Sequence, residues 1–104
     1  MIYVIATIEI TAGKRDEFVR AFRANVPNVL AEDGCIEYEP TVDLATEIKA
    51  QPAMRANFVT VVEKWESLDA LNAHLVAPHM LSYREKVKVL VKGVSIQVLE
   101  PATM

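Results

Sequence analysis

The fold is decided by one stretch, VTVVEKWESLDALNAHLVAPHM, which runs from Val59 to Met80. Its first residues are mostly β-branched and predict a strand, and leucines at helical spacing follow. The stretch also holds the only tryptophan of the chain, Trp65, and both histidines, His74 and His79. The rare residue types are therefore concentrated in one strand–helix unit.

The strand of this stretch is expected over residues 57–66 and ends at a helix cap. Ser67 is a residue type that caps helix N-termini, and Asp69 carries a negative charge that the helix dipole favours in the first turn. Leu68, Leu71 and Leu75 form the apolar stripe of this short helix. Pro78 suits the first turn of a further helix, which we expect over residues 78–92 and ended by Gly93.

The rest of the chain predicts one long helix and three strands. Phe18, Phe22 and Val26 recur at helical spacing, so we expect a helix over residues 15–32, kinked at Pro27 and followed by the left-handed Gly34. The expected strands cover residues 2–10, 35–42 and 94–99.

This order of elements is β-α-β-β-α-β, with the second helical segment broken before Pro78. It predicts an α+β, ferredoxin-like fold with a four-stranded antiparallel sheet, formed by residues 1–104 as a single domain. The helices are expected to cover one face of the sheet. The other face reads as apolar, so two sheets are expected to pack into a homodimer.

The connection over residues 44–56 is the longest without hydrophobic periodicity, and it contains Pro52. Connections of this length in a compact domain are usually disordered or act as lids over a site. We expect one of these two roles.

Composition limits the classes of partner. The net charge is -3 with both signs mixed along the chain, which argues against nucleic acid and anionic membranes as partners. No apolar run approaches the length of a membrane span, and the N-terminus has no leader-like segment. The single cysteine, Cys35, cannot form an internal disulfide. These features predict a cytoplasmic protein.

Glu63 and Trp65 are two residues apart on the expected strand, so their side chains share a face with Val59 and Val61. A carboxylate on an apolar face must be hydrogen-bonded, paired with a cation or raised in pKa, which makes Glu63 a candidate general base. Trp65 could stack on an aromatic substrate. The alternatives are a structural carboxylate and a packed core indole.

The two histidines lie at helix ends with opposite electrostatic preferences. His74 is near the C-terminus of its helix, which favours imidazolium, and His79 is in the first turn of the next, which favours neutral imidazole. Such a pair can serve as acid and base. Tyr83, one turn after His79, and Tyr38 could reach the same cavity as substrate-binding groups. The alternatives are core or surface histidines and packed tyrosine rings.

Several common site patterns are absent from the sequence. With three glycines there is no phosphate-binding loop, and no nucleophile elbow is present. The spacing of His74 and His79 across Pro78 is poor for a metal site, so no metal is expected. Nothing indicates a nicotinamide or flavin site.

The sequence resembles the antibiotic biosynthesis monooxygenase family of dimeric α/β barrels, and its quinol monooxygenase branch in particular. Three segments carry the resemblance: VPNVLAEDGC from Val26, VEKWES from Val62, and AHLVAPHM from Ala73. The resemblance implies a homodimer with a pocket between the sheet and the helices of each subunit. It also implies oxidation of a quinol or other polycyclic phenol by O₂ without metal, flavin or haem.

By position, the family motif matches Glu63, Trp65, His74 and His79. A base would help to form the electron-rich phenolate, which would react directly with O₂, and Glu63, His74 and His79 are the candidates. Two alternatives stay open. One is isomerisation of a phosphorylated signalling sugar, a reaction of another branch of the family, and the other is a non-catalytic module that binds an aromatic ligand.

Overall fold

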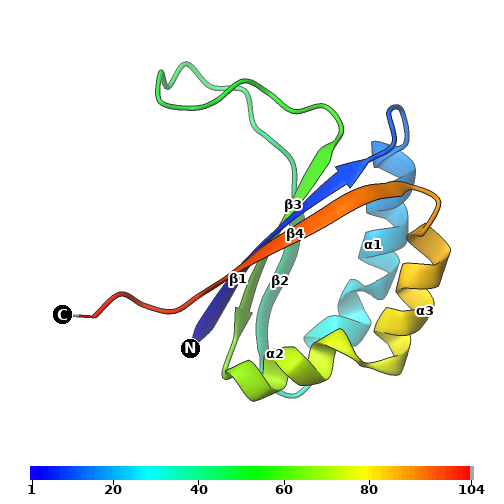
Figure 1. The fold of residues 1–104 in the computed structure, drawn as a ribbon, viewed down its shortest axis with the longest axis vertical. Helices are drawn as coiled ribbons and strands as arrows, with labels where there is room; N and C mark the ends of the chain where they lie inside the picture. Colours follow the sequence, from blue (N-terminus) through cyan, green and yellow to red (C-terminus); the bar gives the residue numbers. More distant parts are fainter. Residues whose placement is uncertain (104) are drawn as a thin grey trace.

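The structure is a computed structural model that describes residues 1–103. Its strands are β1 (Ile2–Ile10), β2 (Cys35–Thr41), β3 (Phe58–Trp65) and β4 (Val91–Leu99), and its helices are α1 (Arg15–Leu30), α2 (Leu68–Leu75) and α3 (Pro78–Val87). Figure 1 shows the helices on one side of the sheet. The predicted α+β, ferredoxin-like order is confirmed. None of the described helices is long and apolar enough to span a bilayer.

The four strands form one antiparallel sheet in the order β2-β3-β1-β4. Ala6 in the centre of β1 pairs with Val61 of β3 and with Ile96 of β4. Directly paired residues share a face, so the inward residues of β1 and β3 meet the helices and form the core. The same parity turns Glu63 and Trp65 inward, because they alternate with the outward-facing Val62 and Lys64.

The connection between α1 and β2 lies against the start of α2. Gly34 adopts a φ of +83°, and a Cβ added there would meet the Ala70 Cβ at 2.6 Å. The Ser67 side chain caps α2 by accepting a hydrogen bond from the Ala70 backbone at 3.1 Å. This close approach of Gly34 to Ala70 brings Glu32, at the end of α1, near the C-terminal part of α2.

The last helix is shorter than we expected, because α3 ends at Val87 and not at residue 92. Val91 pairs with Ile10 and Gly93 pairs with Glu9, so both belong to β4. The Leu90 carbonyl also accepts a hydrogen bond from the Thr11 backbone at 2.9 Å. Pairing with β1 therefore prevails over the helical spacing of Leu90 and Val91, and Gly93 does not terminate the helix.

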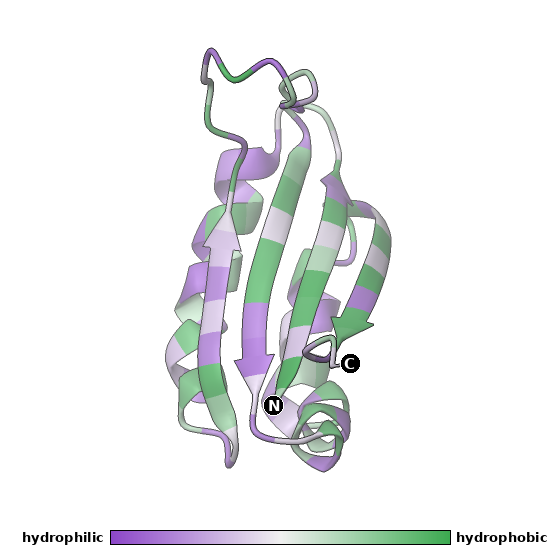
Figure 2. Ribbon diagram, turned by 90° about the vertical axis from the view of Figure 1, so that its left-hand side faces the viewer, coloured by the Kyte–Doolittle hydropathy of each residue, from purple (hydrophilic) through white to green (hydrophobic). Residues whose placement is uncertain are grey.

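Figure 2 shows hydrophilic and hydrophobic residues interspersed along the strands of the sheet. The face that no helix covers carries charged and apolar side chains together, so the expectation that it is apolar is wrong. Glu37 pairs with Lys64 across β2 and β3, and Glu39 pairs with Val62 on the same outer face. A row of exposed apolar side chains lies instead on the helix-facing side of the edge strand β4. They are Val94, Ile96 and Val98, which are 45% to 61% exposed.

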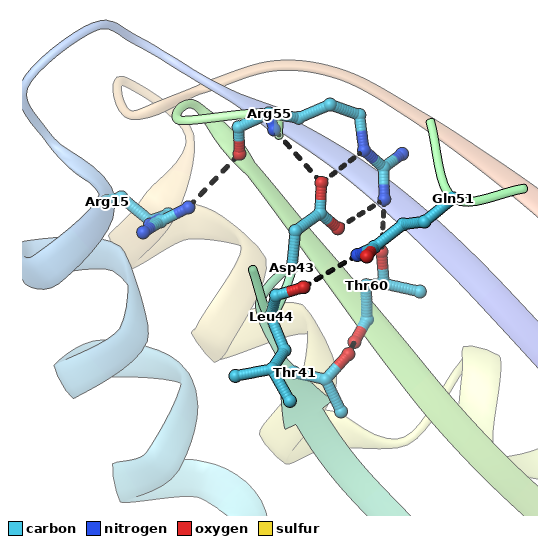
Figure 3. A network of polar contacts seen from close by, with 7 residues as sticks. All are labelled: Arg15, Thr41, Asp43, Leu44, Gln51, Arg55 and Thr60. Atoms are coloured by element: carbon cyan, nitrogen blue, oxygen red, sulfur yellow. Dashed lines mark hydrogen bonds and ion pairs between the residues drawn. The ribbon is translucent and has the colours of Figure 1, made fainter. Parts of the chain in front are cut away.

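The loop between β2 and β3 projects from one end of the sheet (Figure 1) and is fixed at its base. The Arg55 guanidinium donates two hydrogen bonds to the Asp43 carboxylate, at 2.8 and 2.9 Å (Figure 3). Arg15 of α1 donates to the Arg55 carbonyl at 3.2 Å, and Gln51 donates to the Leu44 carbonyl at 2.6 Å. None of residues 44–56 lines the main cavity, which counts against the expected lid.

Asp43→Asn is expected to speed backbone amide exchange in residues 44–54 without changing the binding of an aromatic ligand in the cavity. Hydrogen bonds from Arg55 hold the pKa of Asp43 at about 2, so the pair is charged at neutral pH. Hydrogen–deuterium exchange measures the effect, and Glu47→Gln, in the same loop, is the matched control. Unchanged exchange, or weakened ligand binding, would contradict this account of the loop.

Candidate active site

A cavity of about 410 Å³ lies between the sheet and helices α2 and α3. Most of its wall is apolar and comes from all three helices, from β1 and β3, and from β4. Its polar lining residues are Tyr38, Glu63, His74, Tyr83, Arg84 and Lys88. An apolar cleft of this size with a few polar groups is typical of a small-molecule site.

Glu63 brings a carboxyl group into this apolar wall. Its side chain is buried, with 6% exposed, and one oxygen accepts a hydrogen bond from the Trp65 Nε1 at 3.0 Å. Loss of hydration raises the pKa of Glu63 to about 7, although the Trp65 hydrogen bond opposes this shift. The group can therefore gain or lose a proton near neutral pH, as a general acid or base requires.

Trp65 lies behind the cavity wall and does not line it. The residue is fully buried, and its ring centroid is 4.7 Å from that of His74. Its indole thus holds Glu63 through the N–H and supports His74 through its ring. This position gives Trp65 a supporting role and leaves no ring face in the cavity for the stacking we expected.

His74 lines the cavity from α2 and is 2% exposed. Its Nδ1 lies 2.8 Å from Glu32 Oε2. Burial lowers the pKa of His74, even though the contact with Glu32 acts in the opposite direction. The expectation that its helix end favours imidazolium is therefore wrong, because loss of hydration outweighs the partial charge of a short helix.

His79 does not line this cavity. It lies in a smaller pocket of about 140 Å³ on the other side of Glu32, with Asn25, Asn28 and Tyr83 among its neighbours. Its Nε2 is 2.9 Å from the same Glu32 oxygen that His74 contacts. The two histidines are thus brought together through a carboxylate, but only His74 reaches the main cavity.

Tyr38 and Tyr83 both line the cavity, as we expected from the sequence. The Phe22 ring stacks on the Tyr38 ring with 5.2 Å between the ring centroids, and it meets the Tyr83 ring edge-on with 5.7 Å between the centroids. Burial raises the pKa of both phenols, so each hydroxyl is protonated at neutral pH and can donate a hydrogen bond.

Three site residues were missed by sequence reasoning. Glu32 was assigned only to the end of a helix, and its contact with two residues more than 40 positions away depends on the Gly34 turn. Arg84 and Lys88 were not among the expected site residues, although both line the cavity. Their spacing of four residues on α3 was the only available signal.

No cluster of three or more metal-ligating side chains occurs among residues 1–103. Glu32, His74 and His79 approach one another, but the imidazoles share a single carboxylate oxygen. Glu32 is hydrogen-bonded to His74 and in close contact with His79, so both imidazoles meet the same side of one carboxylate.

Comparison with protein families supports the resemblance seen in the sequence. The model of the family "Antibiotic biosynthesis monooxygenase" matches residues 1–86. The chain is 40% identical over 103 residues to an Escherichia coli K12 protein named "Probable quinol monooxygenase YgiN", a match that covers 97% of this chain and 98% of that protein. A Shigella flexneri protein of the same name matches equally well.

Solved structures show the same fold. PA3566 from Pseudomonas aeruginosa has a TM-score of 0.78 and 25% identity, with 98% of this chain and 94% of that chain covered. Rv0793 from Mycobacterium tuberculosis has a TM-score of 0.78 and 26% identity, with 99% of this chain and 96% of that chain covered.

Proposed function

Because the chain belongs to the antibiotic biosynthesis monooxygenase family, we propose that it oxidises a quinol or related polycyclic phenol with O₂. The observation that carries this proposal is the position of Glu63, a carboxyl group with a pKa of about 7 in the apolar wall of a cavity. Such a group can take a phenolic proton at neutral pH and so generate the electron-rich phenolate that reduces O₂.

The cavity offers two proton acceptors, which matches the two hydroxyl groups of a quinol. Glu63 supplies a carboxylate, and neutral His74 supplies a ring nitrogen. A quinol that loses two protons and two electrons becomes a quinone, and O₂ that accepts them leaves as H₂O₂. In the monooxygenase variant, one oxygen atom replaces a ring hydrogen to give a hydroxyquinone, and the other leaves as water.

The remaining lining residues position the substrate. The phenols of Tyr38 and Tyr83 donate hydrogen bonds to substrate oxygens, and the ring of Phe22 holds both tyrosines in place. The apolar walls favour a polycyclic aromatic ligand and exclude water from the reacting phenolate. No metal or flavin is required, because the phenolate transfers its electrons directly to O₂.

The active form is proposed to be a homodimer. Val94, Ile96 and Val98 form an exposed apolar row on the edge strand β4, and two of them also line the cavity. A second copy packed on this row would shield the apolar side chains and complete the cavity wall.

One observation favours a second candidate, the isomerisation of a phosphorylated sugar. Arg84 and Lys88 both line the cavity, and neither forms an ion pair within the described residues. Two cations at one wall would suit a phosphate group. The otherwise apolar lining fits a sugar less well than an aromatic ring.

Oxygen consumption tests the proposal. Purified protein treated with a chelator is mixed with a reduced naphthoquinone, O₂ uptake is recorded, and the product is identified by mass spectrometry. We expect saturable O₂ uptake above the uncatalysed rate, with a quinone or hydroxyquinone as product. Saturable quenching of Trp65 fluorescence without turnover would indicate a binding module, and conversion of a phosphorylated keto-sugar would indicate the isomerase.

A further inference from the structure

Glu32 has no assigned role, yet it contacts both histidines of the chain. It follows the end of α1, and its Oε2 lies 2.8 Å from His74 Nδ1 and 2.9 Å from His79 Nε2. The carboxylate lines neither pocket, while His74 lines the main cavity and His79 lines the smaller one. Glu32 therefore connects a histidine of the main cavity with a histidine of the smaller pocket, and Tyr83 lines both pockets.

Hydrogen-bond chemistry assigns the proton positions in this cluster. A carboxylate only accepts, so His74 must carry its proton on Nδ1 to bond with Glu32. The neutral ring then has its lone pair on Nε2, and no described side chain bonds to that atom. Since His74 lines the cavity, Nε2 is the ring nitrogen left for a ligand.

The far side of Glu32 is fixed by a chain of amides. Asn28 donates to Asn25 Oδ1 at 3.0 Å, which orients the Asn25 amide so that its nitrogen faces His79 Nδ1 at 3.2 Å. His79 thus accepts at Nδ1 and carries its proton on Nε2, which points toward Glu32. The Nε2 contact lacks the alignment of a full hydrogen bond, so His79 supports Glu32 mainly by its position at 2.9 Å.

We propose that Glu32 is a positioning residue that holds His74 with Nδ1 protonated and Nε2 presented to the cavity as a proton acceptor, while His79 and Asn25 hold Glu32. The inference rests on the proposed function for the identity of the proton donor, a phenolic substrate. When Nε2 takes the phenolic proton, His74 becomes an imidazolium, and the adjacent carboxylate stabilises that charge. His79 thereby changes from a candidate catalytic residue to a support.

Other titratable groups surround His74. Tyr38 on β2, Glu63 on β3 and Tyr83 on α3 line the same cavity as His74, and His79 and Arg84 on α3 act on its charge. Arg84 and His79 lower the pKa of His74, whereas Glu32 raises it. Glu32 is the only one of these groups with a direct hydrogen bond to the ring among the described residues.

Nitrogen-15 NMR of the histidine side chains in the intact protein tests the proposal without any substrate. At neutral pH we expect His74 Nδ1 to be protonated and Nε2 to be unprotonated. In Glu32→Gln the pKa of His74 should fall further, because the charge-assisted hydrogen bond is lost. Asp33 is the next residue in the chain, and its side chain is exposed. Asp33→Asn therefore removes one negative charge without a contact to His74, and His74 should titrate in this variant as it does in the wild type.

Turnover of a reduced naphthoquinone gives the second readout. Glu32→Gln should lower kcat about 10–100-fold, the effect of one lost charge-assisted hydrogen bond, with little change in KM. Asp33→Asn should keep the wild-type kcat. Three results would overturn the proposal. The first is a wild-type His74 protonated on Nε2, and the second is an unchanged titration of His74 in Glu32→Gln. The third is an active wild type whose kcat is unchanged by Glu32→Gln. An inactive wild type with the expected NMR result would reject only the oxidation, and the wild-type spectrum decides the proton position even where a variant fails to fold.

Discussion

Glu63→Gln is expected to lower the turnover of a reduced naphthoquinone about 100- to 10,000-fold at pH 7.5, the range typical of a lost general base. Glutamine has nearly the same shape, and its amide oxygen can still accept the hydrogen bond that Trp65 donates at 3.0 Å. It cannot take a proton from a phenol. The cavity should therefore keep its form while the carboxylate chemistry is lost.

The measurement is steady-state O₂ uptake, combined with a binding titration of an unreactive naphthoquinone analogue. Binding should change by less than about threefold, because the shape of the apolar wall is conserved. Glu37→Gln is the matched control, since Glu37 is exposed on the outer face of β2, opposite Lys64. Equal losses of turnover in the two variants would rule out a special role for Glu63.

The second large effect is on stability and depends on pH. The pKa of Glu63 is about 7 in the folded protein against an ordinary value of 4.5, a difference of about 2.5 units. At about 1.4 kcal/mol per unit, the group contributes about 3 to 3.5 kcal/mol below pH 4.5, and this stabilisation is lost as the pH rises through 7. The folded state holds the proton more tightly, so its stability falls with increasing pH in this window.

Chemical denaturation of the wild type and of Glu63→Gln at pH 4.5 and pH 8.5 measures this effect. We expect the difference in unfolding free energy between the two proteins to shift in favour of the variant by about 3 kcal/mol at the higher pH. His74 has the opposite sign, because its lowered pKa favours the folded state as pH rises. His74 is present in both proteins, so its contribution cancels. A pH-independent difference would show that Glu63 is not buried as the structure has it.

Local rules predicted most of the fold. Alternation along β3 placed Glu63 inward, Ser67 marked the start of α2, and Pro78 marked the start of α3. Each of these features depends on a few neighbouring residues. The end of α3 was missed because pairing of Val91 with Ile10 is a contact between distant parts of the chain.

The site was predicted only where it depends on strand parity or helix spacing. Glu63, Tyr38 and Tyr83 reach one cavity as expected. The contact of both histidines with Glu32 was not predictable, because it joins residues more than 40 positions apart and depends on the close approach of Gly34 to Ala70. The pKa of His74 was predicted in the wrong direction, since burial is a property of the assembled core.

The pH dependence of kcat/KM for quinol oxidation tests the central claim most directly, because it reports the protonation of the free enzyme. The wild-type value should rise with pH through a midpoint near 7, as Glu63 ionises. The same step should be absent from the residual activity of Glu63→Gln. A midpoint near 7 that persists in Glu63→Gln would contradict the assignment of Glu63 as the base.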